Sequence, residues 1–404
     1  MKKKFLAKFN IIIPIIVVIF NVFLILNPTE MISAAKDGLQ LWFNQVLPTL
    51  LPFAVGANLL AGLGFIHFIG VLTAPVMMPL FKVPGAGAFA LLTGFTSGYP
   101  MGAKAVAHLR ETNQIRQDEA QRLIAFSNNA GPLFVVGFIG AGLFNSVKLG
   151  YVMLISHIIA ALIIGLVTRF FFLSNSPPQA TTSSGLNQAF KAYRKFQNSH
   201  YKGFGQALGA SIKNAMESMI LIGGFIIVFC VVIRVLETAG LFFVLNFFYT
   251  NDDYPWLTGL VAGLLEVANG AKMIAQGSPP NPASLAVTAA LISFGGFSIH
   301  GQTAHFIRHT DIQFIPYLAA KCFQALIAGF ICFFISSHFV MPTATSALLA
   351  TDINFFERLV TAGYDFALLV ILMVAMAFCF SFVISYKGKN KYYNEFNEKR
   401  PDFK

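Results

Sequence analysis

Charged side chains are scarce in this sequence. Of its 404 residues only 11% are charged and 56% are hydrophobic, and the mean hydropathy is +0.68. A soluble globular domain carries about 25% charged residues. Several apolar runs also reach the roughly 18 to 20 residues that span a bilayer. This shortage of charge excludes a soluble domain and predicts a protein that crosses the membrane several times.

Acidic residues are fewer than basic ones: the chain has 17 Asp and Glu and 28 Lys and Arg, which gives a net charge of +11. The basic residues gather at the ends of apolar runs, which is typical of cytoplasmic loops rather than of a nucleic-acid-binding surface. Residues 174–213 contain five Lys or Arg and no acid at all, and the N-terminal Met1-Lys-Lys-Lys4 and the tail from Lys387 are also basic. The pattern predicts a multi-pass cell-membrane protein with both termini and the 174–213 segment in the cytoplasm.

Motifs of catalysis and metal binding are missing. The four cysteines lie within apolar runs and form no CxxC pair, and the chain has no HExxH, GxSxG or P-loop motif. His305 and His309 have the spacing of two ligands on one helix face, but no third ligand accompanies them. We therefore expect no enzyme, no metal site and no cofactor.

One polar, Gly-rich stretch is present in two copies. Phe95-Thr-Ser-Gly-Tyr-Pro-Met-Gly-Ala-Lys104 is echoed more loosely by Leu264-Leu-Glu-Val-Ala-Asn-Gly-Ala-Lys272. After each copy comes a second polar break, at 126–132 and 292–302, and then a long apolar run. Broken, polar-lined segments in corresponding places of two halves are typical of a transporter site at the membrane midplane. The predicted fold is an all-α integral membrane bundle with inverted repeats and broken or re-entrant helical hairpins.

The expected organisation has five parts. Residues 1–38 hold an N-terminal transmembrane helix, for which a cleaved signal peptide ending near Ala34-Ala35 is the alternative. Residues 39–173 and 214–337 form the two repeats, joined by the basic linker 174–213, and residues 338–404 hold a last transmembrane helix and the basic tail. Charge placement gives the leading helices of the two repeats, from Leu39 and from Ala215, opposite directions across the membrane.

Three further expectations concern single elements. Residues 85–106 are predicted to form a re-entrant hairpin, because glycines and Pro100 disfavour one straight helix. Ile66 to Phe81 is too short to span comfortably and is interpreted as an interfacial or half-membrane segment. His108 to Leu123 is predicted to be one polar cytoplasmic helix.

The candidate solute-binding residues are the polar side chains of the four breaks. Charged groups inside a membrane are functional candidates by default, so Lys104 and Lys272 are expected to face one cavity and bind an anionic group. Alternatives remain open: the lysines could snorkel to the surface, Ser and Asn could cap a helix, and a lone His could be structural. Glu266 is a possible charge partner of Lys272. The full set is Thr96, Ser97, Tyr99, Lys104, Ser127, Asn128, Asn129, Glu266, Asn269, Lys272, Ser298, His300 and Gln302.

These motifs resemble a known family. The stretch from Thr96 to Lys104, the Arg- and Glu-containing segment after it, and Phe126-Ser-Asn-Asn-Ala-Gly-Pro-Leu-Phe134 are similar to sporulation integral membrane proteins of the YlbJ type. That family carries the nucleoside-recognition Gate domain, which also occurs in concentrative nucleoside transporters. The resemblance extends over about 39–336 and implies a transporter-like fold with a role in spore formation.

Two functions follow as hypotheses. The first is a transporter-like protein of the lipid bilayer that moves or binds a small polar or anionic solute, a nucleoside-like molecule being one candidate. The second is a non-transporting membrane protein of envelope or spore assembly. Nucleic acid is not expected as a partner, and a homo-oligomer is left open.

Overall fold

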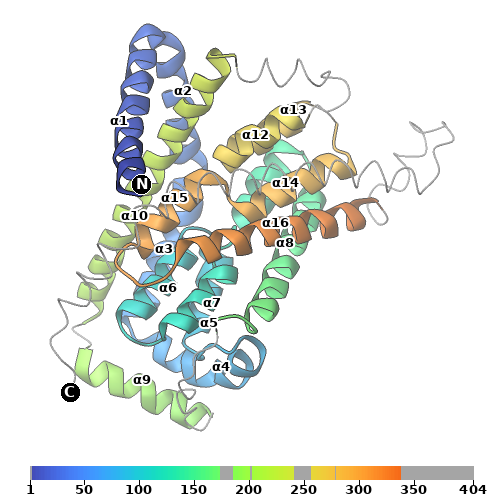
Figure 1. Cartoon of the computed structure of the whole chain (residues 1–404). Coiled ribbons are helices and arrows are strands. Elements are labelled where there is room, and N and C mark those ends of the chain that lie inside the picture. Colours follow the sequence, from blue (N-terminus) through green and yellow to red (C-terminus); the bar gives the residue numbers. More distant parts are fainter. Residues whose placement is uncertain (1, 173–184, 201–202, 241–255, 278, 338–404) are drawn as a thin grey trace.

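The computed structural model describes residues 2–172, 185–200, 203–240, 256–277 and 279–337 (Figure 1). Within these ranges the chain is entirely helical and contains no strand. Five helical segments of the described residues are long and apolar enough to cross a membrane: Pro28–Gly62, Val147–Thr168, Phe204–Thr238, Pro282–Ile307 and Phe314–Ile335. The expected last helix of the chain, from about Phe355 to Tyr386, lies outside the described residues.

The outer faces of the bundle are apolar. Large hydrophobic side chains such as Ile220, Phe323 and Phe330 are about 60% exposed (63%, 61% and 62%). Exposed apolar surface on this scale is costly in water, whereas it is favoured against lipid chains. The chain is therefore an integral, multi-pass membrane protein.

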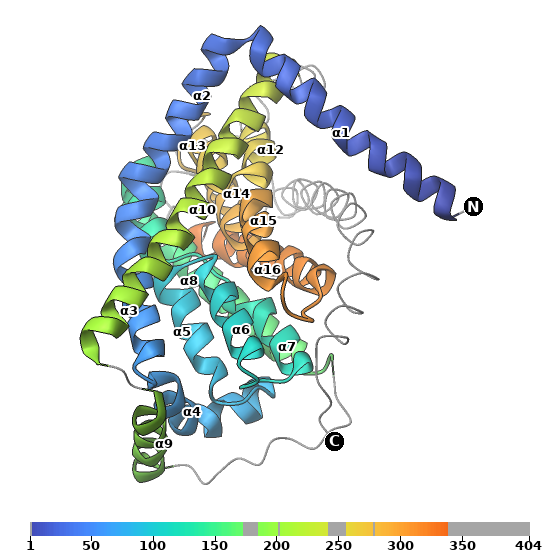
Figure 2. The same ribbon diagram turned by 90° about the vertical axis from the view of Figure 1, so that its left-hand side faces the viewer.

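The N-terminal helices form a long arm. Helix α1 (Lys2–Leu26) projects from the bundle, and α2 (Pro28–Leu41), the π-helical turn η1 (Trp42–Val46) and α3 (Leu47–Gly62) continue along α10 (Phe204–Thr238) (Figure 2). The segment expected to begin at Leu39 thus begins at Pro28, since proline suits the first helical position. Next to Pro48, the Thr49 hydroxyl donates to the carbonyls of Gln45 and Val46 at 2.7 and 3.0 Å.

Two short helix pairs follow from the repeated Gly-Ala-Lys stretches. Helices α5 (Gly87–Ser97) and α6 (Met101–Glu111) pack together, and so do α12 (Leu257–Leu265) and α13 (Val267–Gly277). The first pair is broken at Gly98, whose φ of 81° suits glycine, and the second is broken at Glu266. The helix–break–helix geometry expected for 85–106 is present.

Glycine permits the close approach in each pair. A Cβ on Gly94 or Gly102 would lie 1.7 or 2.1 Å from the carbonyl oxygen of Ser127, and a Cβ on Gly270 would lie 2.1 Å from the Cα of Gly263. No side chain fits at such distances. The glycine of each Gly-Ala-Lys motif is therefore required by backbone packing around the breaks.

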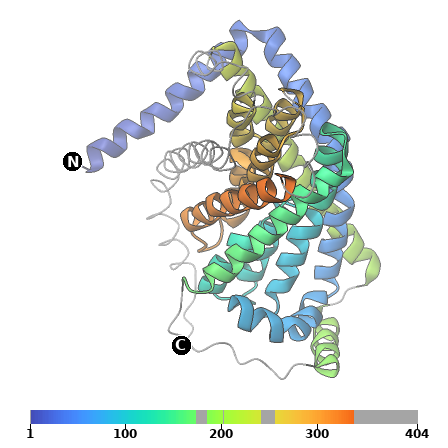
Figure 3. The same ribbon diagram turned by 90° about the vertical axis from the view of Figure 1, so that its right-hand side faces the viewer.

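The second break of each half interrupts a longer crossing. Helix α7 (Gln117–Ser127) gives way at 128–131 to the π-helical η2 (Leu133–Leu143), and α14 (Pro282–Phe294) gives way at Gly295 to α15 (Gly296–Ile307). Gly295 has a φ of 96°. Helices α8 (Val147–Thr168) and α16 (Phe314–Ile335) then pack against each other, side by side in Figure 3.

Contacts between these elements are reciprocal. Helix α6 packs on α15 as α13 packs on η2, and α7 packs on α16 as α14 packs on α8. When the helices are matched in chain order, α6 with α13, α7 with α14, η2 with α15 and α8 with α16, each of these contacts has an equivalent contact. The breaks are thereby gathered at the centre of the bundle.

The prediction of one polar helix from His108 to Leu123 is wrong. The chain leaves α6 after Glu111, Asn113 takes a left-handed φ of 54°, and a new helix begins at Gln117. The Glu119 carboxylate accepts a 2.7 Å hydrogen bond from the Arg116 backbone N–H, which satisfies an otherwise orphaned donor at the new N-terminus. Local capping thus outweighed the helical pattern of the segment.

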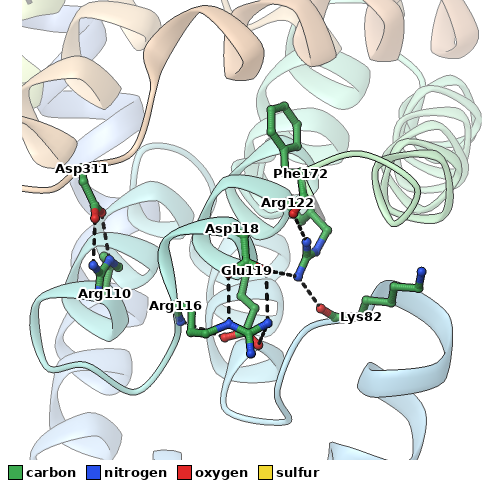
Figure 4. A network of polar contacts seen from close by, with 8 residues as sticks. All are labelled: Lys82, Arg110, Arg116, Asp118, Glu119, Arg122, Phe172 and Asp311. Atoms are coloured by element: carbon green, nitrogen blue, oxygen red, sulfur yellow. Dashed lines mark hydrogen bonds and ion pairs between the residues drawn. The ribbon is translucent and has the colours of Figure 1, made fainter. Parts of the chain in front are cut away.

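Charged groups at this end of the bundle tie distant segments together (Figure 4). Arg110 forms a bidentate pair with Asp311, both bonds at 2.8 Å, which joins α6 to the turn before α16. Gln121 and Gln313 exchange side-chain and backbone hydrogen bonds at 2.9 and 2.7 Å. Burial raises the pKa of the Asp118 carboxyl, but contacts with Arg116 and Arg122 outweigh it and leave that pKa below its usual value.

A helix also lies within the segment predicted to be a linker. Helix α9 (Leu186–His200) packs on α4 (Phe65–Phe81) through Phe196 against His67 and Phe190 against Phe68. Helix α10 begins at Phe204, before the linker was expected to end. Composition indicated the basic charge of this segment but not its helix, whose apolar face is filled by contacts with α4.

Candidate functional site

All four breaks contribute to one cavity. Gly98 and Tyr99 come from the first break, Gly131 from the second, Glu266 from the third, and Ser298 and Gln302 from α15 just after the fourth. The remaining walls are mostly apolar and come from η1, α3, η2, α10, the start of α13 and α15: Val46, Thr49, Leu50, Phe134, Ile222, Ile226, Val267, Ala268 and Ile299. An apolar space with a few convergent polar groups is the usual form of a small-molecule site.

The cavity is narrow. About 40 Å³ of it has room for the centre of a water molecule, which is enough for a few waters. A ligand of nucleoside size requires the breaks to move apart. The site described here therefore fits a small ligand, or the closed form of a larger site.

Unpartnered polar atoms gather around these breaks. Six buried side-chain atoms of the predicted site residues lack a hydrogen-bond partner among the described residues: Ser97 Oγ, Tyr99 OH, Ser127 Oγ, Asn128 Oδ1, His300 Nε2 and Gln302 Oε1. Leaving a buried polar atom unpaired costs about 1–3 kcal/mol. Two of the six, Tyr99 OH and Gln302 Oε1, belong to side chains that line the cavity, where a bound polar partner would satisfy them.

Glu266 forms the break between α12 and α13 and caps the second helix. Its carboxylate accepts hydrogen bonds from the backbone N–H of Ala268 at 3.2 Å, and from the N–H and side-chain amide of Asn269 at 2.9 and 3.0 Å. The side chain is 3% exposed. The Asn269 amide also donates to Cys230 Sγ on α10, so the expected site residue Asn269 positions Glu266 and does not line the cavity.

Asn128 and Asn129 face the interior of the bundle. The Asn128 amide donates to Thr303 Oγ1 and Tyr317 OH at 3.0 and 2.9 Å. His300, on the face of α15 away from the cavity, contacts the same Tyr317 hydroxyl at 3.3 Å. The predicted residues of the second and fourth breaks are thus brought together, but in a buried network beside the cavity.

Two side chains outside the predicted set hold the second break. Lys321 on α16 is buried and donates to the carbonyl oxygen of Asn128 at 2.7 Å and to Gln324 Oε1 at 2.6 Å. His157 on α8 accepts from the Ala130 N–H at 3.1 Å, so its other nitrogen carries the proton and donates to Ser293 Oγ at 2.8 Å. A lone Lys and a lone His in apolar runs were the signals available.

The lysines of the Gly-Ala-Lys motifs do not line the cavity. Lys104 is half-buried and donates to Asn214 O and Ser218 Oγ of α10 at 3.1 and 2.7 Å. Lys272 is exposed and makes no ion pair with Glu266. Neither side chain reaches this cavity, since Lys104 is bonded to α10 and Lys272 lies at the surface. Thr96 is also exposed and bonds back to Leu92 O of its own helix.

Comparison with known proteins agrees with this architecture. The chain is 32% identical over 317 residues to the "Sporulation integral membrane protein YlbJ" of Bacillus subtilis (strain 168), covering 75% of this chain and 77% of that protein. The chain belongs to the YlbJ family. Residues 43–174 match the nucleoside-recognition (Gate) family, a range that runs from η1 past the end of α8. No solved structure matches the chain.

We predict that the network around Lys321 stabilises the fold. Gln324→Leu removes the acceptor of Lys321 Nζ and the donor to Asn129 Oδ1, which lies 3.1 Å away. Unsatisfied buried groups of this kind cost about 1–3 kcal/mol each, so we expect a clear drop in the thermal unfolding midpoint of the purified protein. The control is Gln276→Leu at an exposed position of α13, where little change is expected. Equal effects of the two substitutions would contradict this role.

Proposed function

We propose that this member of the YlbJ family binds a small polar solute in the cavity between the four breaks and moves it across the membrane. The supporting observation is the concentration of unpartnered buried polar atoms around those breaks. We assign direct solute contact to Tyr99, Ser298 and Gln302, which line the cavity. The absence of enzyme motifs agrees with a non-catalytic, transporter-like role.

Reciprocal packing supports an inverted repeat. On this proposal α5 to α8 correspond to α12 to α16, and each pair of equivalent helices runs in opposite directions across the membrane. The range matched by the nucleoside-recognition family, 43–174, falls almost wholly within the first proposed repeat, 39–173. The second repeat, 214–337, is then a divergent copy. Alternating access by rocking one repeat against the other is the mechanism associated with such symmetry.

Helix length supports re-entrant hairpins. An eleven-residue helix such as α5 or α6 is about 16 Å long, roughly half the thickness of the hydrocarbon core. Each hairpin then enters the membrane and turns back near its midplane. The unpaired backbone groups at such a turn are tolerated only against protein or water, and here they border the cavity.

Sporulation gives the proposal its biological setting. The name of the Bacillus subtilis relative assigns that protein to sporulation, and we propose a related role for this chain. A second candidate is a non-transporting protein of envelope or spore assembly. The narrowness of the cavity favours this alternative, since about 40 Å³ admits no solute of nucleoside size without movement of the breaks.

A ligand screen on the purified full chain tests solute binding. We expect at least one class among nucleosides, sugars, amino acids and organic phosphates to raise the thermal unfolding midpoint, because a ligand that binds only the folded state stabilises it by about 2.7 kcal/mol at 100 times its Kd. Gln302→Leu, which removes an unpartnered acceptor from the cavity, should weaken the effect. Thr96→Ala, at an exposed position of α5 beside the first break, should leave it unchanged. A flat response to the whole panel would favour the assembly role.

We also propose that both termini and the 174–213 segment are cytoplasmic, as the positive-inside rule requires. In a variant without native cysteines, Ser199→Cys on α9 should be protected from a membrane-impermeant maleimide in intact cells. Gln276→Cys, at the end of α13, should react. Both positions are exposed, so access to the reagent depends on the side of the membrane. The opposite labelling pattern would reverse the assigned orientation.

A further inference from the structure

We propose that the ligand of this cavity carries one positive charge, and that Glu266 is its anchor: the site takes a monovalent cation, either a metal ion or a small ammonium compound. This inference rests on the proposed function, because it names the chemical class that the same cavity accepts. It reverses the sign expected from the sequence, where the two Gly-Ala-Lys lysines predicted an anion. The charge that the structure brings to the cavity is a carboxylate instead.

Among the described residues that line the cavity, Glu266 is the only Asp, Glu, Lys or Arg. It forms no ion pair within the described part of the chain. Lys104 is held by α10, and Lys272 is exposed. An isolated buried carboxylate is costly unless a positive partner neutralises it. No lysine or arginine supplies that partner here, which leaves a proton or a bound cation to neutralise the group.

Helix capping explains only part of the Glu266 geometry. Three N–H donors of Ala268 and Asn269 contact its two oxygens, and a carboxylate offers about four lone-pair sites. These donors and the N-terminal end of α13 stabilise the ionised carboxylate. Burial favours the neutral acid against these contacts, so a cation bound at the free lone-pair sites would hold the group in its ionised form.

A second, independent acceptor lines the same space. Gln302 is 2% exposed, and its Oε1 has no hydrogen-bond partner among the described residues. Its Nε2 donates to Ser298 Oγ at 3.3 Å, which leaves the amide oxygen as the unpaired atom. A carbonyl oxygen cannot donate a hydrogen bond, so it requires a cation or a donor.

The aromatic wall and the size of the cavity agree with this ligand. Tyr99 and Phe134 line the cavity as a T-shaped pair with ring centroids 6.2 Å apart, and aromatic faces attract cations. The Tyr99 hydroxyl has no partner among the described residues and adds a further possible acceptor. A single carboxylate matches a single positive charge, and a small cation suits a space of about 40 Å³.

Thermal unfolding of the full chain in lipid nanodiscs tests the inference. Sodium, potassium, lithium, choline and tetramethylammonium chlorides are each compared with N-methyl-D-glucamine chloride at equal ionic strength. We expect at least one of these cations to raise the unfolding midpoint of the wild-type protein in a saturable manner. The metal-ion and ammonium arms tell the two sources of charge apart. Glu266→Gln, whose amide oxygen can still cap α13, should lower the affinity for the stabilising cation at least tenfold.

Controls separate the site from general electrostatics. Glu30→Gln removes an exposed carboxylate from the first turn of α2, and Lys272→Met removes an exposed charge from α13 itself. Both should keep the cation response of the wild-type protein. If Glu266→Gln does not fold, Gln302→Leu replaces it in the test. This substitution removes the second acceptor and should lower the affinity for the same cation several-fold.

Either of two results would overturn the inference: no cation of the series stabilises the wild-type protein, or Glu266→Gln responds as the wild type does. A neutral or anionic solute that stabilises both wild type and Glu266→Gln would leave the proposed solute site standing and remove its cationic character. If no solute and no cation stabilises the wild-type protein, both the solute site and its cationic character are contradicted.

Discussion

Backbone hydrogen bonding inside a membrane is the constraint on which this structure depends. Lipid offers no partner to a free N–H or C=O group, so a helix can be broken there only where protein or water receives those groups. This chain breaks four helices within its described residues and gathers the breaks at one place. That single requirement is met by the glycines, by the capping carboxylate of Glu266 and by the side chains of α8 and α16.

At the second break the freed backbone groups are satisfied by side chains from both halves, His157 and Lys321. They lie four residues before Ala161-Leu-Ile-Ile-Gly165 and Ala325-Leu-Ile-Ala-Gly329, the two similar segments of α8 and α16. Lys321 donates a hydrogen bond to the carbonyl group freed at Asn128, and His157 accepts one from the N–H of Ala130. One short break is thus held from both central helices. Movement of that break, which transport would require, has to break or carry along both contacts.

Much of the architecture could be predicted from the sequence, because scarcity of charge and clustering of glycine act over long stretches. The helical membrane class, the paired breaks and the role of Gly102 and Gly270 follow from such patterns. The orientation of single side chains could not be predicted, since it depends on which neighbour a helix face meets. Lys104 and Lys272 belong to the same motif yet do not line the cavity, whereas Glu266, predicted as a solute-binding residue and possible charge partner of Lys272, does. Lys321 was overlooked because the backbone group that it holds, the carbonyl of Asn128, lies 193 residues away in the sequence.

Whether water reaches the meeting point of the breaks is the most direct test of this account. In a variant without native cysteines, Ser298→Cys should react with a small, charged methanethiosulfonate reagent, although Ser298 lies deep in an apolar bundle and is 1% exposed. Phe323→Cys, on the 61% exposed outer face of α16, should stay inert in lipid nanodiscs because a thiol facing lipid does not ionise. Reaction at Ser298→Cys alone is the predicted result. Equal inertness of the two cysteines, in a protein otherwise folded, would contradict a water-accessible site at the breaks.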